Sequence, residues 1–203
     1  EASDKVVMPG LFEMHTHQST GTGERLGKIW LSYGITSVRE PGSDPYEALE
    51  RKEAWSSGIR PGPREFYTGP LMDGNRIAYG LAATVTDRRH VRQELERARI
   101  LDYDLIKTYV RMPDSVQKEL TKGAHELGIP TSSHELYPAI GYGVDAIEHL
   151  SGTSRRGYSM LLDGSFRSYD DVIQLIAQSG ANITPTLCLR TGFYRMVKQY
   201  DEL

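Results

Sequence analysis

Short apolar runs of strand type alternate along this chain with segments of helical period, and this alternation constrains the fold more than any other feature. Strands that are connected through a helix lie parallel in a sheet, with the helices packed on its outside. Strands are predicted at residues 11–15, 35–39, 64–69, 104–110, 130–134, 144–148 and 182–187. Apolar stripes predict helices near residues 26–33, 91–98, 116–127 and 172–176, and Asp44-Pro45 opens a fifth helix that Gly58 closes.

Seven successive parallel strands indicate a barrel. The alternative is an open, doubly wound sheet, which predicts a glycine-rich phosphate loop where this chain has Met14-His15-Thr16-His17. We therefore predict an α/β fold of the TIM (β/α)8-barrel type, in one domain over residues 1–203. We expect an incomplete barrel of about seven βα units with the eighth strand missing. Its two open edges would then be covered by an oligomer or by the remainder of a longer chain.

The composition argues against several classes of partner. A hydrophobic content of 38% in 203 residues suffices for one core. The net charge of −3 and the lack of a basic block argue against nucleic acid and anionic membranes, and no apolar run is long enough for membrane insertion. The single cysteine, Cys188, excludes an internal disulfide framework but leaves the compartment open.

Residues that can bind metal or move protons stand on or near the ends of four predicted strands. They are His15, His17, Lys107, His134 and His149. The carboxyl ends of the strands in a parallel barrel converge on one rim, where active sites of this architecture are built. Two histidines one residue apart can hold one metal ion between them. Taken alone, His134 could also be a hydrogen-bonded histidine and His149 a core histidine.

Two further histidines are assigned no part in the chemistry. His125 lies inside the predicted helix 116–127, so we interpret it as structural. His90 stands among arginines at a solvated helix start, so we interpret it as a surface residue.

Lys107 occupies an apolar strand, where an unpaired ammonium is costly to bury. Burial lowers the pKa of a lysine, so the neutral amine becomes available as a nucleophile or as a target for carbon dioxide. The resulting carbamate is an anion with two oxygens, and it can bridge two metal ions. The alternative is an ion pair with a nearby carboxylate such as Glu40 or Glu148.

The segments MPGLFEMHTH, YGITSVREPG, PGPREFYTGP, DLIKTYV, IPTSSHE, GVDAIEHL and NITPTL resemble the amidohydrolase superfamily of metal-dependent hydrolases, in the order found there. The chain is most similar to the imidazolonepropionase-like and prolidase-like branch, particularly to members fused behind a Tol-type β-propeller, which fits a periplasmic or other extracytoplasmic location. The resemblance implies that His15 and His17 bind one metal ion, that His134 and His149 bind a second, and that Lys107 bridges them as a carbamate. Lys107, His134 and His149 would also serve catalysis. Two zinc ions suit these ligands, with manganese, cobalt or iron as alternatives.

The resemblance also implies a reaction, in which a metal-bound hydroxide cleaves an amide or other C–N bond of a small peptide-like or cyclic amide substrate. The superfamily completes this site with an aspartate after an eighth strand, but the chain stops at Leu203, and Asp201 lies too close to the seventh strand. We therefore expect a truncated chain that is inactive or impaired as it stands. Two alternatives stay open. One is a mononuclear deaminase of the same superfamily, which leaves Lys107 unexplained, and the other is a non-catalytic barrel that binds metal or a partner.

Substrate contacts are expected from residues that follow the rim strands. The candidates are Arg39, Tyr109, Glu135 and Tyr137, with Arg155 and Arg156 as further basic residues. An arginine among them would bind a substrate carboxylate.

Overall fold

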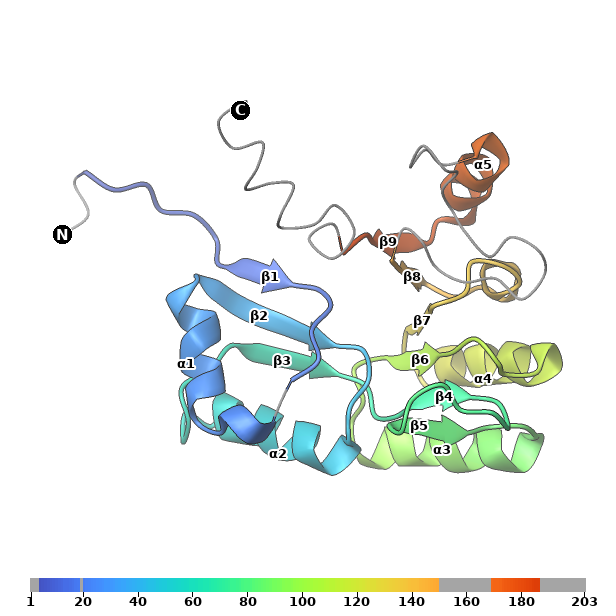
Figure 1. The fold of residues 1–203 in the computed structure, drawn as a ribbon, viewed down its shortest axis with the longest axis horizontal. Helices are drawn as coiled ribbons and strands as arrows, with labels where there is room; N and C mark the ends of the chain where they lie inside the picture. The colour runs from blue at the N-terminus through green and yellow to red at the C-terminus, as the bar shows by residue number, and fades with distance from the viewer. Residues whose placement is uncertain (1–3, 19, 150–168, 187–203) are drawn as a thin grey trace.

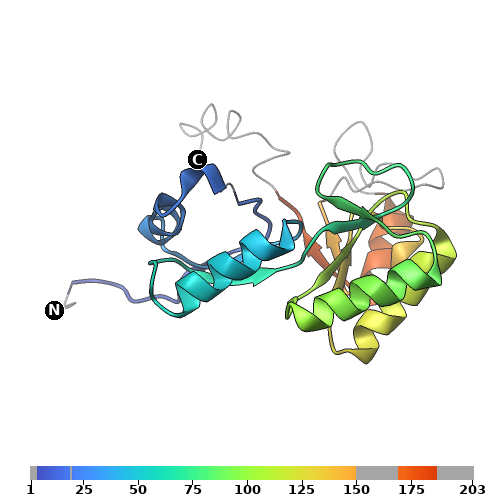
Figure 2. The same cartoon turned by 90° about the horizontal axis from the view of Figure 1, so that it is seen from below.

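The computed structural model describes residues 4–18, 20–149 and 169–186, in which parallel strands carry helices on their outer side (Figures 1 and 2). The strands are β1 (Leu11–Glu13), β2 (Ile35–Glu40), β3 (Arg64–Tyr67), β4 (Leu71–Asp73), β5 (Ala82–Thr84), β6 (Ile106–Thr108), β7 (Thr131–Ser133), β8 (Ala146–Glu148) and β9 (Asn182–Thr184). The helices are α1 (Arg25–Ser32), α2 (Pro45–Ser56), α3 (Arg88–Ile100), α4 (Asp114–Glu126) and α5 (Asp170–Ser179), with 3-10 turns η1 (Thr20–Thr22) and η2 (Ala139–Tyr142). None of the helices in the described ranges is long and apolar enough to span a bilayer.

The strands form two sheets, with the orders β1-β2-β3 and β5-β4-β6-β7-β8-β9, and every pair is parallel. The N–H of Asp104 donates a hydrogen bond of 2.9 Å to the carbonyl of Tyr67, which joins the end of β3 to the segment before β6. Because β4 follows β3 directly along the chain, the first sheet leads into the second as in a barrel wall, with β5 added at the edge beyond β4. The predicted α/β fold with an incomplete barrel is confirmed, and no closed barrel forms within the described ranges.

The start and end of α2 show how the sequence defines a helix. The carboxylate of Asp44 accepts hydrogen bonds from the N–H groups of Tyr46 and Glu47, at 3.0 and 3.1 Å, and Pro45 occupies the first helical position. Gly58, just beyond the helix, has a φ of 76°, a left-handed conformation that glycine adopts without strain. The predicted limits of this helix therefore hold.

Except for β2, which extends one residue further to Glu40, the predicted strands are shorter in the structure. β1 ends at Glu13, so His15 and His17 lie in the loop that follows the strand and not within it. The predicted strand 64–69 ends at Tyr67, and the three-residue strands β4 and β5 were not predicted, since a run of three residues shows no recognisable period. Leu187, the predicted end of the last strand, lies outside the described residues.

Two apolar clusters hold the strands in place. The larger one packs α3 and α4 against β3, β4 and β6, and its largest members include Tyr67, Met72, Ile106, Met112 and Leu120. The smaller one packs α5 and η2 against β8 through Leu136, Ile147 and Val172. Figure 2 shows α3 and α4 side by side on the outer face of the second sheet. The helices thereby fix the strands whose carboxyl ends carry the predicted site.

A cluster of three charged side chains is buried between α2 and the first sheet. Arg51 donates from Nε to both carboxylate oxygens of Glu65, each at 2.9 Å, and from Nη2 to the carboxylate of Glu40. Glu40 also accepts a hydrogen bond of 2.8 Å from the N–H of Gln18, which anchors the residue after His17. Burial raises the pKa of Glu40 to about 8, against the opposing charge of Arg51.

Glu40→Gln is expected to raise the free energy of unfolding, by an amount that grows with pH. The pKa of Glu40 in the folded protein, about 8, lies above its usual value of 4.5, so the folded protein holds a proton that the unfolded chain releases. The contribution of Glu40 to the free energy of unfolding is therefore fully present below pH 4.5 and is lost as the pH rises through about 8. Glutamine does not ionise, so the variant does not lose stability in this way. We expect a gain of about 1–3 kcal/mol near pH 9, measured by urea denaturation across the pH range.

The control for this prediction is Glu47→Gln, since Glu47 is exposed in the first turn of the same helix. It should leave the pH dependence of stability unchanged. A Glu40→Gln protein whose stability follows the pH exactly as the wild type does would contradict the prediction.

Candidate active site

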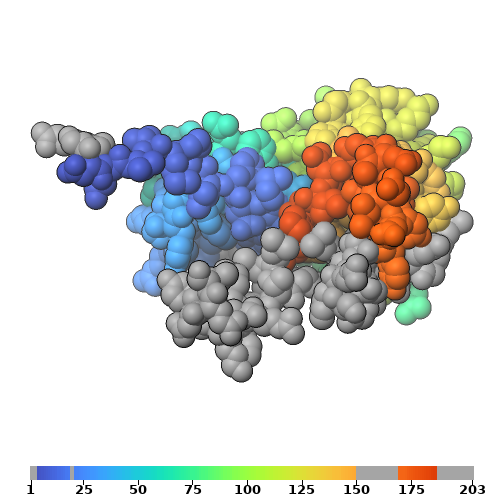
Figure 3. Space-filling view, turned by 90° about the horizontal axis from the view of Figure 1, so that it is seen from above, coloured from blue at the N-terminus to red at the C-terminus, as the bar shows by residue number. Residues whose placement is uncertain are grey.

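A cavity of about 1070 Å³ opens at the carboxyl ends of the strands. Both sheets contribute to its wall. The loop after β1 supplies His15 and His17, and β6 supplies Lys107, while Thr184 and Pro185 at the end of β9 lie on the same wall. In the view from above, the N-terminal segment with β1 meets the surface formed by β9 and α5 (Figure 3). The cavity therefore lies where the first and last described strands approach one another.

All five residues that the sequence singles out for chemistry line this cavity: His15, His17, Lys107, His134 and His149. The ring centroids of His15 and His17 are 5.2 Å apart, those of His15 and His149 4.4 Å, and those of His134 and His149 4.5 Å. Residues spread over 135 positions of the chain thus converge, because the carboxyl ends of parallel strands meet at one edge.

Hydrogen bonds orient three of the imidazole rings. The Nδ1 atom of His15 lies 2.8 Å from a carboxylate oxygen of Glu148, and Nδ1 of His149 lies 2.6 Å from the hydroxyl of Thr186. The Nδ1 atom of His17 lies 3.2 Å from the carbonyl of Gly42, which can only accept, so Nδ1 carries the proton and a lone pair remains on Nε2. This is the arrangement in which a histidine ligates metal through its second nitrogen.

Backbone strain accompanies His149. This residue has a φ of 71° and Thr186, its hydrogen-bond partner, a φ of 45°, both in the left-handed region. Such a conformation is costly for a β-branched residue such as threonine. Strain of this kind concentrates at functional sites, where the surrounding contacts hold it in place.

Lys107 is buried, with 1% of its surface exposed, and within the described residues its Nζ has no hydrogen-bond partner. The closest carboxylate oxygen belongs to Glu148, at 3.8 Å, which is ion-pair range but too long for a hydrogen bond. The alternative partner Glu40 is instead bound to Arg51. Burial lowers the pKa of Lys107 to about 7, so a large fraction of its amine is neutral near neutral pH.

His134 also has a buried polar atom without a partner. Its Nδ1 makes no hydrogen bond within the described part of the chain, and its ring packs against Tyr109 at 4.8 Å between centroids. Burial, together with the nearby charge of Lys107, lowers the pKa of His134 to about 2, so its imidazole is neutral. A neutral imidazole with an open nitrogen is the form that binds metal.

The donor set fits a metal ion in its chemistry. Two buried donor atoms, Nζ of Lys107 and Nδ1 of His134, face a cavity that further imidazoles line. Imidazole nitrogen suits zinc and other divalent transition metals. In the described ranges, no three His, Cys, Asp or Glu side chains already form a metal-holding group.

The sequence analysis named Glu148 only as a possible ion-pair partner of Lys107, and the structure gives it further contacts. Its carboxylate accepts from Nη2 of Arg39 at 2.8 and 2.7 Å and lies beside both His15 and Lys107. Burial alone would raise its pKa, but the charges of Lys107 and Arg39 and the hydrogen bond to His15 hold the pKa well below its usual range. Its place one residue before His149 was the sequence signal that could have pointed to it.

Of the four residues expected to contact substrate, one lines the cavity and three do not. Tyr109 lines the cavity and packs against Tyr79 at 5.6 Å between ring centroids. Arg39, Glu135 and Tyr137 do not line it. The guanidinium of Arg39 is directed to Glu148, Glu135 is fully buried, and the side chain of Tyr137 lies on the surface. Glu135 and Tyr137 follow β7, and outside a strand the side chains lose their alternation, so these two loop residues could not be assigned a direction. Arg39 lies within β2, and its guanidinium is held by Glu148.

The remaining predictions concern residues away from the cavity. Nε2 of His125 donates to the carboxylate of Asp145 at 2.8 Å, which ties α4 to the start of β8, and His90 contacts Thr86 at the start of α3. Neither lines the cavity. Arg155, Arg156 and Asp201 lie outside the described residues.

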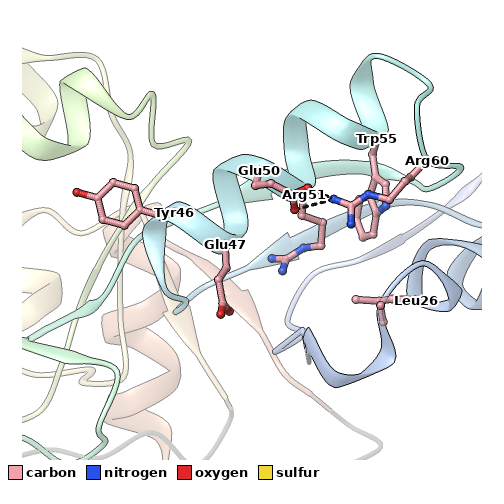
Figure 4. A pocket seen from close by; sticks show the side chains of 8 residues that line it. Leu26, Tyr46, Glu47, Glu50, Arg51, Trp55 and Arg60 are labelled. Carbon is pink, nitrogen blue, oxygen red and sulfur yellow. Dashed lines mark hydrogen bonds and ion pairs between the residues drawn. The ribbon is translucent and has the colours of Figure 1, made fainter.

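A second cavity, of about 400 Å³, lies between α1 and α2 (Figure 4). Its wall includes Leu26, Trp55 and the partly exposed ion pair between Arg60 and Glu50, at 2.6 Å. None of the predicted site residues lines it.

The fold is shared with solved hydrolases. The chain matches a Xaa-Pro dipeptidase with bound methionine in the active site at a TM-score of 0.67 and 20% identity, over 95% of this chain and 56% of that one. It matches the ochratoxinase of A. niger at a TM-score of 0.70 and 16% identity, over 93% and 54% of the two chains. It matches phenylurea hydrolase B at a TM-score of 0.65 and 15% identity, over 86% and 52%. The chain therefore spans roughly half the length of these structures.

At these identities, the similarity establishes the fold alone. No family model matches the sequence, and no curated protein matches it.

Proposed function

We propose that this chain carries the metal-binding part of the active site of an amidohydrolase-type enzyme, which cleaves an amide or other C–N bond in a small peptide-like or cyclic amide substrate. One observation carries the proposal. The buried side chain of Lys107 lines a cavity that four histidines also line, and its Nζ has no hydrogen-bond partner among the described residues. The shared fold supports it, because the matching structures include a dipeptidase and two other hydrolases.

In this proposal, His15 and His17 hold one metal ion, and His134 and His149 hold a second. The neutral amine of Lys107 would react with carbon dioxide, forming an N–C bond and releasing one proton, and the resulting carbamate would supply anionic oxygens to the metal ions. Zinc suits this donor set, with manganese, cobalt and iron as alternatives. Metal ions held in this way lower the pKa of water and polarise a carbonyl oxygen.

The residues of the chain itself prepare the site. Burial keeps the imidazole of His134 neutral and a large fraction of the Lys107 amine deprotonated, which are the forms that bind metal and carbon dioxide. Other side chains that line the cavity are apolar or aromatic and bind the substrate body; they are Leu71, Tyr79, Leu81 and Tyr109.

The loop that carries Tyr79 is held by Asp73. This buried carboxylate accepts hydrogen bonds from the N–H groups of Gly74, Ala78 and Arg111, at 2.9, 3.0 and 2.8 Å. Tyr79 then packs against Tyr109, so the apolar wall has a defined position before substrate arrives.

Tyr109→Ala is expected to raise KM by about 10-fold, because it removes a ring from the substrate wall and apolar contacts in a binding pocket are worth about 1–3 kcal/mol. Tyr109→Phe keeps the ring and should stay within about 3-fold of the wild type if packing is what matters. Tyr33→Ala, at an exposed position after α1, is the matched control. Steady-state kinetics decides, and an unchanged KM in Tyr109→Ala would remove Tyr109 from the substrate wall.

The experiment that tests the function uses the complete gene product that contains residues 1–203. The protein is stripped with a chelator, supplied with zinc, manganese or cobalt, and incubated with Xaa-Pro dipeptides, N-acyl amino acids and cyclic amides, with products measured by mass spectrometry. We expect hydrolysis that metal restores and that His134→Ala abolishes. Hydrolysis that survives in His134→Ala would contradict the assigned site, and metal uptake without turnover of any amide would favour a binding protein.

A further inference from the structure

The carboxylate of Glu148 connects both halves of the candidate site. It is fully buried, and it contacts Nδ1 of His15 at 2.8 Å, Nη2 of Arg39 at 2.7 and 2.8 Å, and Nζ of Lys107 at 3.8 Å. Burying a carboxylate is costly unless its oxygens are bound. Metal binding and substrate binding, as proposed above, do not account for this group.

Arg39 holds this carboxylate in place and also holds the loop that carries His15. Its Nε donates to the carbonyl of Met14 at 2.6 Å, and its Nη2 donates to the hydroxyl of Thr184 at 3.0 Å as well as to Glu148. Arg39 belongs to the first sheet, whereas Glu148 and Thr184 belong to the second. The arginine therefore links the two sheets and sets the position of the residue directly before His15.

These contacts define which ring nitrogen of His15 carries a proton. Glu148 is ionised because it lies between two cationic groups, the guanidinium of Arg39 at 2.7 and 2.8 Å and the amine of Lys107 at 3.8 Å, and an ionised carboxylate can only accept hydrogen bonds. The nitrogen that faces it, Nδ1 of His15, is consequently the donor. In the neutral ring the lone pair then resides on Nε2.

We propose that Glu148, oriented by Arg39, is a positioning residue that holds His15 as its Nδ1-protonated tautomer and so leaves Nε2 as the metal-binding nitrogen. The tautomer follows from the contacts themselves, and its use in metal binding rests on the proposed function. His17 obtains the same tautomer from the carbonyl of Gly42, so a side chain controls this choice for His15 but the backbone controls it for His17. A substitution of Glu148 can therefore change the tautomer of His15 without changing that of His17.

The test is nitrogen NMR on metal-free protein labelled with 15N-histidine, at about pH 8.5, where histidine rings are neutral. The signals of His15 are identified by their loss in His15→Asn. In the wild type we expect a protonated Nδ1 and an unprotonated Nε2. Glu148→Gln keeps an acceptor oxygen and should preserve this pattern, whereas Glu148→Leu removes the acceptor and should shift the population toward the Nε2-protonated form.

The matched control is Glu65→Gln, which alters another buried carboxylate paired with an arginine, away from the histidines. It should leave the His15 signals unchanged. Glu148→Leu should also weaken zinc binding by about 10–100-fold, the usual effect of losing a ligand's hydrogen-bond partner, and Glu65→Gln should not.

A wild-type His15 that carries its proton on Nε2 would overturn the proposal, as would a Glu148→Leu protein with an unchanged tautomer. The wild-type spectrum decides even if Glu148→Leu does not fold. Failure of the proposed function looks different, because the predicted tautomer would then be present in a protein that takes up no metal.

Discussion

Replacement of Lys107 by methionine is expected to lower kcat/KM by more than about 100-fold, since loss of even a ligand's hydrogen-bond partner costs about 10–100-fold. The same change is expected to raise the free energy of unfolding by about 1–4 kcal/mol, because a buried cation is replaced by an apolar side chain of similar volume. Glu148 keeps Arg39 as its partner in the variant. Opposite effects on activity and stability are the signature of a residue retained for chemistry.

The stability difference between Lys107→Met and the wild type is expected to depend on pH in a defined direction. In buffer free of carbon dioxide and metal, the pKa of Lys107 is about 7 in the folded protein and 10.5 when unperturbed. Between these values the unfolded chain holds the extra proton, so the stability of the wild type rises with pH from about 7 upward. The advantage of Lys107→Met is therefore largest below pH 7 and shrinks toward pH 10, as chemical denaturation at several pH values can show.

Lys122→Met is the control, because this lysine lies 78% exposed on α4. It should change neither activity nor the pH slope. A Lys107→Met protein that loses stability would show that the ion pair with Glu148 outweighs the cost of burial, and would contradict our account of this lysine.

Lys107→Ala separates the carbamate from a simple ion pair. The shortened side chain leaves room where the carbamate would lie, so a small carboxylate such as acetate should restore part of the metal content and part of the activity. Loss of both without rescue would count against the carbamate. No loss of metal at all would favour the ion-pair interpretation.

His134→Ala is the second change with a large expected effect. It removes an imidazole whose Nδ1 has no hydrogen-bond partner among the described residues, and we expect zinc affinity and kcat/KM each to fall by more than about 100-fold. The matched control is His125→Ala, a histidine of α4 outside the cavity. Metal analysis after dialysis measures the effect. Equal zinc in His134→Ala and in the wild type would exclude His134 as a ligand.

The parallel arrangement of the strands could be predicted from the sequence, but their lengths and the edge position of β5 could not. The alternation of strand and helix patterns depends on segments of ten or more residues, which is why the limits of α2 and the parallel order hold. The strands themselves are mostly three residues long, so β1 ends before His15, and β4 and β5 left no periodic signal. Strand ends depend on where neighbouring strands pair, which is decided by contacts far apart in the chain.

The candidate site also has features that the sequence could predict and features that it could not. The convergence of His15, Lys107 and His149 could be predicted, because it follows from strand order and from where parallel strands end. The bond between Arg39 and Glu148 joins residues 109 positions apart, and neither residue has a local pattern that reveals the other. Glu135 and Tyr137, expected as substrate contacts, do not line the cavity, because the chain turns after β7 and the direction of a side chain in a turn has no period.

Metal stoichiometry tests the central claim most directly, namely that four histidines and Lys107 form one two-metal site. The complete gene product is stripped with chelator, titrated with zinc in bicarbonate buffer, and analysed by elemental mass spectrometry alongside a His15→Ala, His134→Ala double variant. We predict about two zinc ions per chain in the wild type and a loss of both in the double variant. A wild type that binds no zinc, or a double variant that binds as much as the wild type, would contradict the account.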